Sequence, residues 1–305
     1  MQNSTNYKKS NKILKSDICV YTTANEEYIP KALISLLSFR YHNPEIDLYI
    51  LSNNFISNKS KNLLKKYNIK LLVIYPENLF YKSFQYPVEC YYIFYGPQVF
   101  INNYKYSMYI DGDIYCDKPI NIDFYKIKNF AGVSIGKIKS VFPNDWNDVF
   151  NHWKFTSIPD YRIQSGVVIF NNSSMIECNF LHVIGEIYDK SIKVGLPRKG
   201  DDSLFSLFQI LRQDIDPYIL PYIYNYIPGE NLSVYATHSS DSTLENPILI
   251  HFTNNNKKPW KKIKSNSNAI HQKKWQSMLI KNLSFFEVLQ YFPSFLLNKA
   301  RNILQ

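Results

Sequence analysis

The amino-acid sequence predicts an α/β domain whose mainly parallel sheet is flanked by helices. Short apolar runs typical of buried strands alternate with segments of helical periodicity along the first hundred residues, and this alternation indicates βαβ units. The chain has 305 residues, and 45% of them are hydrophobic. It is therefore long and apolar enough to bury the core of one large domain.

The first elements alternate regularly between strand and helix. Residues 17–24 are expected to form a buried strand, and Pro30 then suits the first turn of a helix whose apolar positions share one face. Residues 48–51 predict a second strand, residues 57–67 an amphipathic helix capped by its serine, and residues 71–75 a third strand. Strands connected through helices in this way are expected to run parallel.

Later elements are expected on both sides of a pair of aspartates at positions 111 and 113. Residues 91–95 carry four aromatic side chains and predict a helix that leads to a strand at residues 107–110. The same criteria predict strands at residues 131–134, 166–170, 219–226 and 248–252 and a helix at residues 202–211.

The end of the chain differs in character from the rest. The formal net charge is +10, and eight lysines but no acidic residue lie between Glu245 and Glu287. Ser284 and Glu287 form a capping-box pattern before an apolar helical segment, which Pro293 should kink or end. The sequence therefore divides into a flexible N-terminus at residues 1–16, a main domain at residues 17–264 and a basic, amphipathic helical extension at residues 265–305.

Two interpretations of this extension remain open. Lysines beside apolar helices suit a peripheral contact with an anionic membrane surface, whereas the alternative is a helix packed on the main domain or a dimer contact. No stretch approaches the roughly 18 apolar residues that cross a bilayer, and the first 17 residues lack the apolar region of a signal peptide. We therefore expect a cytoplasmic protein that can contact the cytosolic membrane face through the extension.

Two absences limit the kind of ligand site. The first glycine is Gly96, so no glycine-rich phosphate loop can follow an early strand. The four cysteines are scattered without a C-x-x-C pair, which argues against a zinc site or a disulfide framework. If the protein binds a nucleotide, it must neutralise the phosphates in another way, and a metal ion held by carboxylates is the obvious alternative.

Asp111 and Asp113 are the candidates for that metal site. They follow the apolar run at residues 107–110, and the carboxyl ends of strands are where α/β sheets bind ligands. Two carboxylates one residue apart can hold a hard divalent cation that also takes diphosphate oxygens. A second triplet, Asp214-Ile-Asp216, runs into a proline and is expected to lie on a loop. The alternative for Asp111 and Asp113 is a solvated turn.

His251 is the candidate for a third metal ligand. It ends the apolar run at residues 248–250 and is followed by Lys257, Lys258 and a Pro-Trp pair. An imidazole can complete a two-carboxylate site, and a lysine can meet the donor phosphate as negative charge builds on the leaving group. A histidine after a strand is otherwise usually structural.

At these residues the sequence resembles the glycosyltransferases of family 8, which have the GT-A fold and include glycogenin and bacterial lipopolysaccharide galactosyl- and glucosyltransferases. The resemblance covers roughly residues 17–262. It rests on segments similar to the family's first strand, DxD strand, Asn-Ser-Gly-Val segment, Gly-Asp-Gln-x-Leu segment, Leu-Pro…Tyr-Asn segment and His…Lys-Pro-Trp motif. They are Ile18–Tyr28, Met108–Asp113, Gln164–Asn171, Gly200–Leu204, Leu220–Asn225 and His251–Trp260.

The resemblance implies a role for each matched residue. Asp111, Asp113 and His251 would hold Mn²⁺ or Mg²⁺, and the donor would be a UDP-sugar. Gln164, Asp201 and Asp202 would orient the sugar beside the reacting carbon and are the catalytic candidates. The residues implied to bind the donor nucleotide are Thr22, Thr23, Ala24, Asn25, Tyr28, Gly112, Lys257 and Lys258.

The sequence departs from the family pattern in several places. Residues 83–104 contain no basic residue, with Phe94 about where the family often has an arginine or lysine that touches the donor. Gln164 stands for an asparagine, Asp202 for a glutamine and Asn254 for a glycine, and the longer histidine-to-lysine spacing leaves both Lys257 and Lys258 as phosphate-binding candidates.

Asp201 and Asp202 permit more than one interpretation. Neighbouring aspartates at a helix start often serve only as a cap with a favourable dipole interaction. Beside an anomeric carbon, a carboxylate can instead stabilise an oxocarbenium-like transition state or act as a nucleophile. It can also act as a general base, which would make the enzyme inverting, whereas the resemblance implies retention.

The partners expected from these features are a nucleotide sugar and a glycan, glycolipid or glycoprotein acceptor, with membrane contact through the extension. Two competing hypotheses remain. The net charge also suits a nucleic-acid-binding protein, although the lysines cluster at one end and no nucleic-acid-recognition signature occurs, so no nucleic-acid partner is expected. The second is a glycosyltransferase fold that has lost activity and serves as a scaffold.

Overall fold

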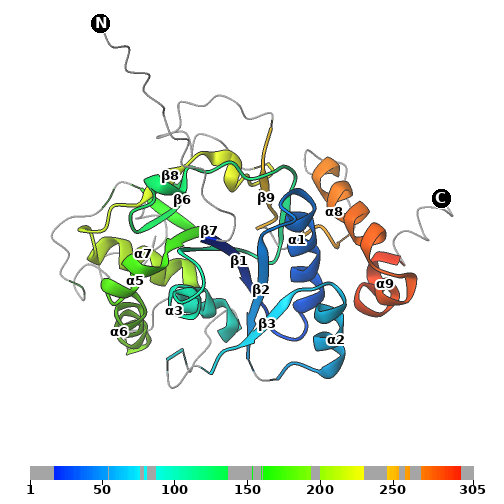
Figure 1. Ribbon diagram of the computed structural model, residues 1–305, viewed down its shortest axis with the longest axis horizontal. Coiled ribbons are helices and arrows are strands. Elements are labelled where there is room, and N and C mark those ends of the chain that lie inside the picture. Colours follow the sequence, from blue (N-terminus) through cyan, green and yellow to red (C-terminus); the bar gives the residue numbers. More distant parts are fainter. Residues whose placement is uncertain are drawn as a thin grey trace, which may run out of the picture.

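The structure, a computed structural model, confirms an α/β architecture in which helices flank a central sheet (Figure 1). The residues that it describes are 17–53, 55–75, 79–80, 87–136, 153, 159, 161–193, 200–229, 246–253, 258–261 and 269–296.

The first half of the sheet is parallel, as the sequence predicts. Strands β1 (Ile18–Thr23), β2 (Asp47–Ser52) and β3 (Lys70–Val73) are joined through helices α1 (Ile29–His42) and α2 (Asn58–Lys66). The α2 helix begins where expected, because the hydroxyl of its N-cap serine accepts a hydrogen bond from a backbone N–H of the first turn at 3.1 Å.

The second half of the sheet contains antiparallel strands. The order of the seven strands is β3-β2-β1-β4-β7-β6-β8. Strand β4 (Tyr106–Ile110) is parallel to β1 but antiparallel to β7 (Arg162–Asn171), and β7 is antiparallel to β6 (Phe130–Ile135). The edge strand β8 (Tyr218–Leu220) is parallel to β6. The sheet therefore changes direction beside β4, the strand that ends at Asp111.

A separate two-stranded sheet joins two distant parts of the chain. Strand β5 (Ile114–Cys116) pairs antiparallel with β9 (Leu249–His251), and Ile114 lies directly opposite His251. The pairing therefore brings the histidine beside the residue that follows Asp113. Among the described residues, this short sheet places the strand expected at residues 248–252 next to the expected metal site at Asp111 and Asp113.

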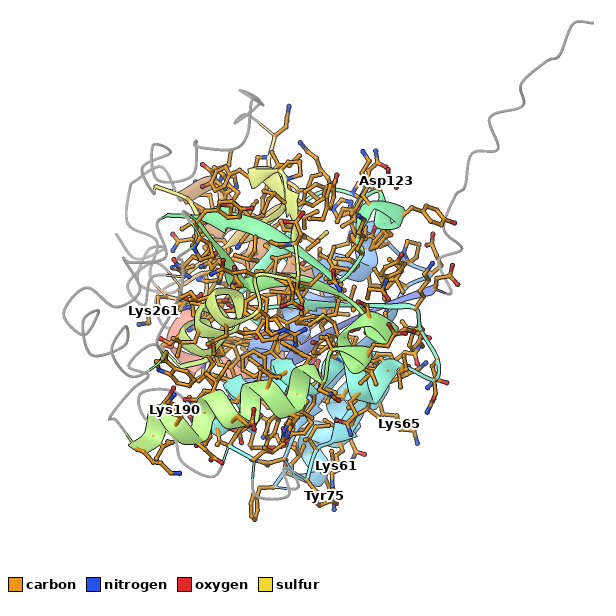
Figure 2. All side chains as sticks on the ribbon, turned by 90° about the vertical axis from the view of Figure 1, so that its left-hand side faces the viewer. Lys61, Lys65, Tyr75, Asp123, Lys190 and Lys261 are labelled. Atoms are coloured by element: carbon orange, nitrogen blue, oxygen red, sulfur yellow. The ribbon has the colours of Figure 1, made fainter. Side chains whose placement is uncertain are left out.

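The core lies on both faces of the large sheet, because neighbouring strand residues point to opposite sides. Met108 and Ile110 of β4 belong to the apolar cluster that contains α1, whereas Tyr109 belongs to the cluster on the other face. That second face is covered by α6 (Phe180–Lys193), α7 (Gly200–Leu211) and the 3₁₀ helix η2 (Val88–Tyr95). Figure 2 shows that charged side chains such as Lys61 and Lys65 point outward from this core.

Several elements differ from those that the sequence predicts. The aromatic middle forms η2 followed by the short helix α3 (Gly96–Phe100), because Pro97 suits a helical first turn. The strand expected at residues 219–226 is shorter than predicted: β8 ends before Pro221, after which comes the 3₁₀ helix η5 (Tyr222–Tyr224). Elements that the sequence analysis did not anticipate are β5, α5 (Asn172–Glu177), α6 and the 3₁₀ helix η3 (Phe124–Lys126).

The extension folds into two helices that pack on the main domain. Helix α8 (Ala269–Asn282) lies beside α1 (Figure 1), and its Trp275 is completely buried. Helix α9 (Phe285–Tyr291) begins with the expected capping box and ends before Pro293. The Glu287 carboxylate accepts a hydrogen bond from Lys66 Nζ of α2 at 2.8 Å. The packed interpretation is therefore correct for the buried face of the extension. Among the described residues, no helix combines the length and apolar character needed to span a membrane.

Candidate metal and donor site

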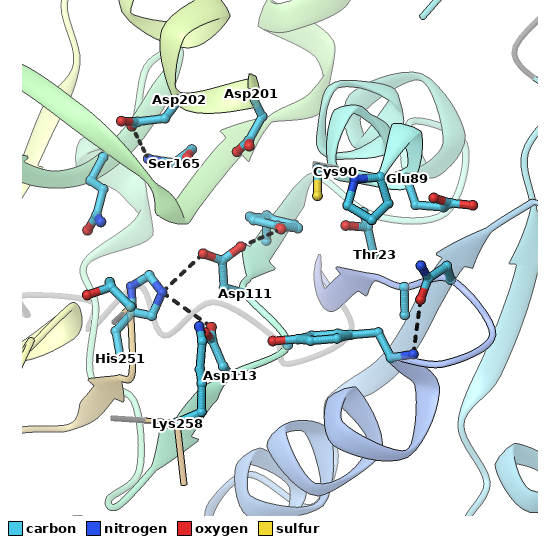
Figure 3. Close-up of a pocket in the computed structure, with 18 of the residues that line it drawn as sticks. Thr23, Glu89, Cys90, Asp111, Asp113, Ser165, Asp201, Asp202, His251 and Lys258 are labelled. Atoms are coloured by element: carbon cyan, nitrogen blue, oxygen red, sulfur yellow. Dashed lines mark hydrogen bonds and ion pairs between the residues drawn. The ribbon is translucent and has the colours of Figure 1, made fainter. Parts of the chain in front are cut away.

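A cavity of about 640 Å³ lies at the carboxyl ends of β1 and β4 (Figure 3). This is the edge of a parallel sheet at which α/β proteins bind ligands. Its walls come from six segments: the loop after β1, η2, the turn at residues 111–113, β7, the start of α7 and the region that follows β9. The lining residues are Thr23, Ala24, Asn25, Tyr28, Pro87, Glu89, Cys90, Tyr109, Asp111, Gly112, Asp113, Gln164, Ser165, Asp201, Asp202, His251, Thr253, Lys258, Trp260 and Lys261.

The structure brings the three predicted metal ligands together. His251 Nε2 lies 3.1 Å from Asp111 Oδ2 and 3.3 Å from Asp113 Oδ1, and one ligand atom of each residue lies within 4.8 Å of the others. Adjacent ligands of an octahedral cation with bonds of about 2.1 Å are separated by about 3 Å. The spacing and the oxygen and imidazole donors therefore fit a small divalent cation such as Mn²⁺ or Mg²⁺.

Two glycines make this close packing possible. A Cβ at Gly166 would lie 2.4 Å from His251 Cε1 and 3.2 Å from Asp111 Oδ2. A Cβ at Gly112 would lie 2.8 Å from Tyr28 Cε1. Gly112 therefore allows the Tyr28 ring to lie against the turn that carries the two aspartates, and Gly166 leaves room for the histidine.

A chain of side-chain amides orients the histidine. His251 Nδ1 is 2.9 Å from Asn225 Oδ1, and Asn225 Nδ2 donates a hydrogen bond to Gln164 Oε1. Because the Asn225 oxygen faces the ring, Nδ1 carries a proton and Nε2 is directed at the aspartates. Asn225 is fully buried. It belongs to the family-like segment Leu220–Asn225, but its residue type and position in the sequence did not indicate a role in the site.

The charges of the site compensate one another. Burial alone would raise the pKa of Asp113, but Lys258 and His251 lower it well below its usual range, and Lys258 Nζ donates a hydrogen bond to Asp113 Oδ2. Burial alone would lower the pKa of His251, but the charges and hydrogen bonds of Asp113 and Asp111 raise it to about 9. Buried ions are tolerated when paired in this way, and a divalent cation would take over the role of these positive groups.

A second acidic group lies at one end of the cavity, at the start of α7. Burial, reinforced by the charges of Asp111 and Asp202, raises the pKa of Asp201 to about 8. The Asp202 carboxylate is bound by Arg162, whose Nη1 lies 2.6 and 2.7 Å from its two oxygens. Figure 3 shows Asp201, Asp202 and Ser165 together on one side of Asp111. The sequence analysis did not identify Arg162.

The opposite end of the cavity carries Thr23, Glu89 and Cys90 (Figure 3). Glu89 is buried and accepts a hydrogen bond from Asn53. The segment that lacks a basic residue therefore contributes a carboxylate and a thiol to the wall, while Phe94 is buried in the core.

Most of the residues predicted to bind the nucleotide lie in the cavity wall. Thr23, Ala24, Asn25, Tyr28, Gly112 and Lys258 line it, and Lys261 was not anticipated. Thr22 does not line it, because successive strand residues alternate and its side chain is buried within β1. Lys257 lies outside the described residues.

Comparisons with known proteins agree with this geometry. Residues 19–264 match the family model described as glycosyl transferase family 8, whereas no curated protein matches the chain. The structure is similar to that of the bifunctional glycosyltransferase WbbM, with a TM-score of 0.64, 16% identity and coverage of 92% of this chain and 52% of that chain. This chain thus spans about half of WbbM.

Two further solved structures are similar. The galactosyltransferase LgtC, in complex with donor and acceptor sugar analogs, has a TM-score of 0.62 at 14% identity, and the match covers 89% of this chain and 99% of that chain. GlyE from Streptococcus pneumoniae has a TM-score of 0.56 at 14% identity, with coverage of 91% and 63%. At these identities the likeness concerns the fold, which is the expected GT-A fold.

Proposed function

Given that this chain belongs to glycosyltransferase family 8 and is therefore a transferase, we propose that it moves a hexose from a UDP-sugar to a hydroxyl group of a glycan, glycolipid or glycoprotein with the help of a divalent cation. The observation that carries the proposal is the meeting of Asp111, Asp113 and His251 at the carboxyl end of β4. The cavity volume of about 640 Å³ also lies within the usual range for small-molecule sites.

The residues of the cavity suggest how the reaction would be divided among them. The cation would neutralise the donor diphosphate. Lys258, which contacts Asp113, would donate to the phosphate as negative charge builds on the leaving group. Gln164, Asp201 and Asp202 would bind and orient the sugar at the end of the cavity that they line. Thr23 and its neighbours would hold the nucleoside.

A thermal-shift experiment tests the metal-dependent site. UDP and Mn²⁺ together should raise the melting temperature more than either alone, because a ligand bound only by the folded protein stabilises it. Asp111→Ala and Asp113→Ala should each abolish the metal-dependent part of the shift.

Asp216→Ala is the matched control, because Asp216 belongs to the exposed second aspartate pair and should keep the full shift. Equal shifts in the wild type and in both site variants would contradict the proposal. Release of hexose from a panel of UDP-sugars would then identify the donor.

We propose that the transfer retains the anomeric configuration. The family resemblance supports retention, and the Asp202 carboxylate already accepts hydrogen bonds from Arg162. One observation favours the inverting alternative: a pKa of about 8 would suit Asp201 as a general base near neutral pH. Nuclear magnetic resonance of the product decides between them, since an α-linked donor gives an α product only by retention.

We also propose that the extension contacts an anionic membrane surface and so brings the enzyme to glycolipid acceptors. Among the described residues of the extension, three large apolar side chains of α9 are exposed, namely Phe285, Phe286 and Leu289. Lys281, in the last turn of α8, precedes them in the chain. Apolar side chains beside lysines are the combination that favours peripheral binding to anionic lipids.

A further inference from the structure

Asp202 is held by a buried ion pair. Arg162 is the first residue of β7 and Asp202 lies in the first turn of α7, so the pair joins the sheet to the helix at the edge of the cavity. The arginine side chain is 11% exposed and the aspartate side chain 20% exposed. One nitrogen of the guanidinium, Nη1, contacts both carboxylate oxygens, and such charge-assisted hydrogen bonds are stronger than neutral ones.

The pair lies where the donor sugar is proposed to bind. Asp202 is among the residues that line the cavity, whereas Arg162 is not. The backbone N–H of Ser165 also donates a hydrogen bond to Asp202 Oδ1 at 3.4 Å. The contact between Arg162 and the cavity that the structure shows is therefore the one through Asp202.

Without the arginine, the Asp202 carboxylate would have the carboxylate of Asp201 as its acidic neighbour. Asp201 precedes it in the chain, and the charge of Asp202 acts on Asp201. Like charges in a poorly solvated cavity repel one another, so an unpaired Asp202 side chain would rotate away. The guanidinium therefore fixes the position of the carboxylate.

We infer that Arg162 is a positioning residue, which holds the Asp202 carboxylate in place at the sugar end of the cavity. The inference rests on the proposed function. It deepens that proposal because Asp202 would orient the sugar as one member of an ion pair with Arg162, and not as a free carboxylate.

The test is a double-mutant cycle with Arg162→Met, Asp202→Asn and the double variant, assayed as UDP-sugar hydrolysis in Mn²⁺. Arg162→Met should lower kcat by about tenfold to a hundredfold, the range expected when a reacting group is misplaced. In the Asp202→Asn background the same change should lower kcat by less than about twofold, because there is no carboxylate left to position. Arg162→Lys, which keeps the charge but carries it on a more flexible side chain of different shape, should be intermediate.

Binding measurements separate positioning from a general structural role. In Arg162→Met, the affinity for UDP with Mn²⁺ should stay within about twofold of the wild-type affinity. The affinity for the intact UDP-sugar that serves as the substrate of the hydrolysis assay should fall relative to the affinity for UDP. Arg212→Met is the matched control, because Arg212 forms a similar ion pair with Asp214 at 2.7 Å that lies outside the cavity lining. It should leave both affinities and kcat unchanged.

The possible results distinguish this inference from the proposed function. An Arg162→Met enzyme with wild-type kcat, or one that loses UDP affinity together with kcat, would overturn the inference alone. An equal loss of kcat in the presence and absence of the Asp202 carboxylate would do the same. A wild-type protein that neither binds UDP with Mn²⁺ nor hydrolyses any UDP-sugar would overturn the proposed function and this inference with it.

Discussion

Asn225 decides which ring nitrogen of His251 is directed at the two aspartates. Its amide group donates to Gln164, so its oxygen is the atom that faces the imidazole. The histidine is thereby held in the form that offers Nε2 to a cation. Groups that orient a metal-binding histidine in this way often contribute as much as a ligand to the affinity.

Removal of the Asn225 side chain should therefore weaken metal binding. We expect Asn225→Ala to lower the affinity for Mn²⁺ by about tenfold to a hundredfold, as measured by isothermal titration in the presence of UDP. Asn129→Ala serves as the control, since Asn129 donates to Ser174 away from the cavity. An unchanged Mn²⁺ affinity in Asn225→Ala would show that the amide does not orient the ligand.

At the scale of single elements, α9 depends on one carboxylate. Glu287 accepts hydrogen bonds from the backbone N–H of Ser284 at 2.8 Å and from Lys66 at 2.8 Å. Burial alone would raise the pKa of Glu287, but these partners outweigh it and hold the pKa below its ordinary value of 4.5. A carboxylate with a lowered pKa stabilises the fold above its unfolded pKa and ceases to do so as the pH falls through the folded value.

The helix should therefore loosen under acidic conditions. Between pH 6 and about pH 5 the contribution of Glu287 is complete, and it should be lost as the pH falls below 4.5. Hydrogen exchange within α9, corrected for the intrinsic pH dependence, should accelerate in the wild type below that pH. In Glu287→Gln it should already be faster at pH 6 and should change less with pH. Equal protection in both proteins at pH 6 would count against the cap.

The elements could be predicted from the sequence where local patterns determine them. The strand before Asp111, the serine cap of α2 and the capping box of α9 all follow from neighbouring residues. The antiparallel direction of β7 and the pairing of β5 with β9 depend on contacts between distant segments, so no local pattern reveals them.

The same distinction applies to the candidate site. Asp111, Asp113 and His251 could be named from motifs, and the structure places them together. Arg162 could not be named, because its partner is 40 positions away in the chain and is met only when α7 packs on β7. The role of Asn225 could not be predicted from the sequence for a related reason. It depends on the complete burial of Asn225 beside His251 and not on the residue type alone.

At the scale of the whole molecule, the extension is part of the cavity's support. Trp275 of α8 packs against Trp260, with ring centroids 5.8 Å apart, and Trp260 packs edge-on against Tyr28, also at 5.8 Å. Both Trp260 and Tyr28 line the cavity. The buried face of the extension thus supports the wall of the cavity, whereas Phe285 and Phe286 of α9 are exposed.

The exposed face should determine membrane binding. Phe285 and Phe286 are 65% and 78% exposed, so Phe285→Ser/Phe286→Ser should barely affect folding. Burial of one phenylalanine contributes about 1.5–3 kcal/mol, and we expect at least about tenfold weaker partitioning of the variant onto phosphatidylglycerol-containing vesicles. The measurement is co-sedimentation at several salt concentrations.

Phe55→Ser is the matched control for this experiment, because Phe55 is 80% exposed and lies outside the extension. It should partition onto vesicles like the wild type. A wild-type protein that ignores anionic vesicles, or a double variant that binds them equally well, would contradict membrane contact through α9.

The pairing of β5 with β9 also has a consequence for biosynthesis. Asp111 and Asp113 leave the ribosome long before His251, whose strand must travel back to lie opposite Ile114. Domains generally begin to fold from the N-terminus during synthesis. The parallel half of the sheet can therefore form on the nascent chain before His251, the third candidate metal ligand, has been added. A ribosome-bound chain arrested before residue 249 should thus be structured yet unable to bind nucleotide, and substrate binding would begin only after His251 has left the ribosome.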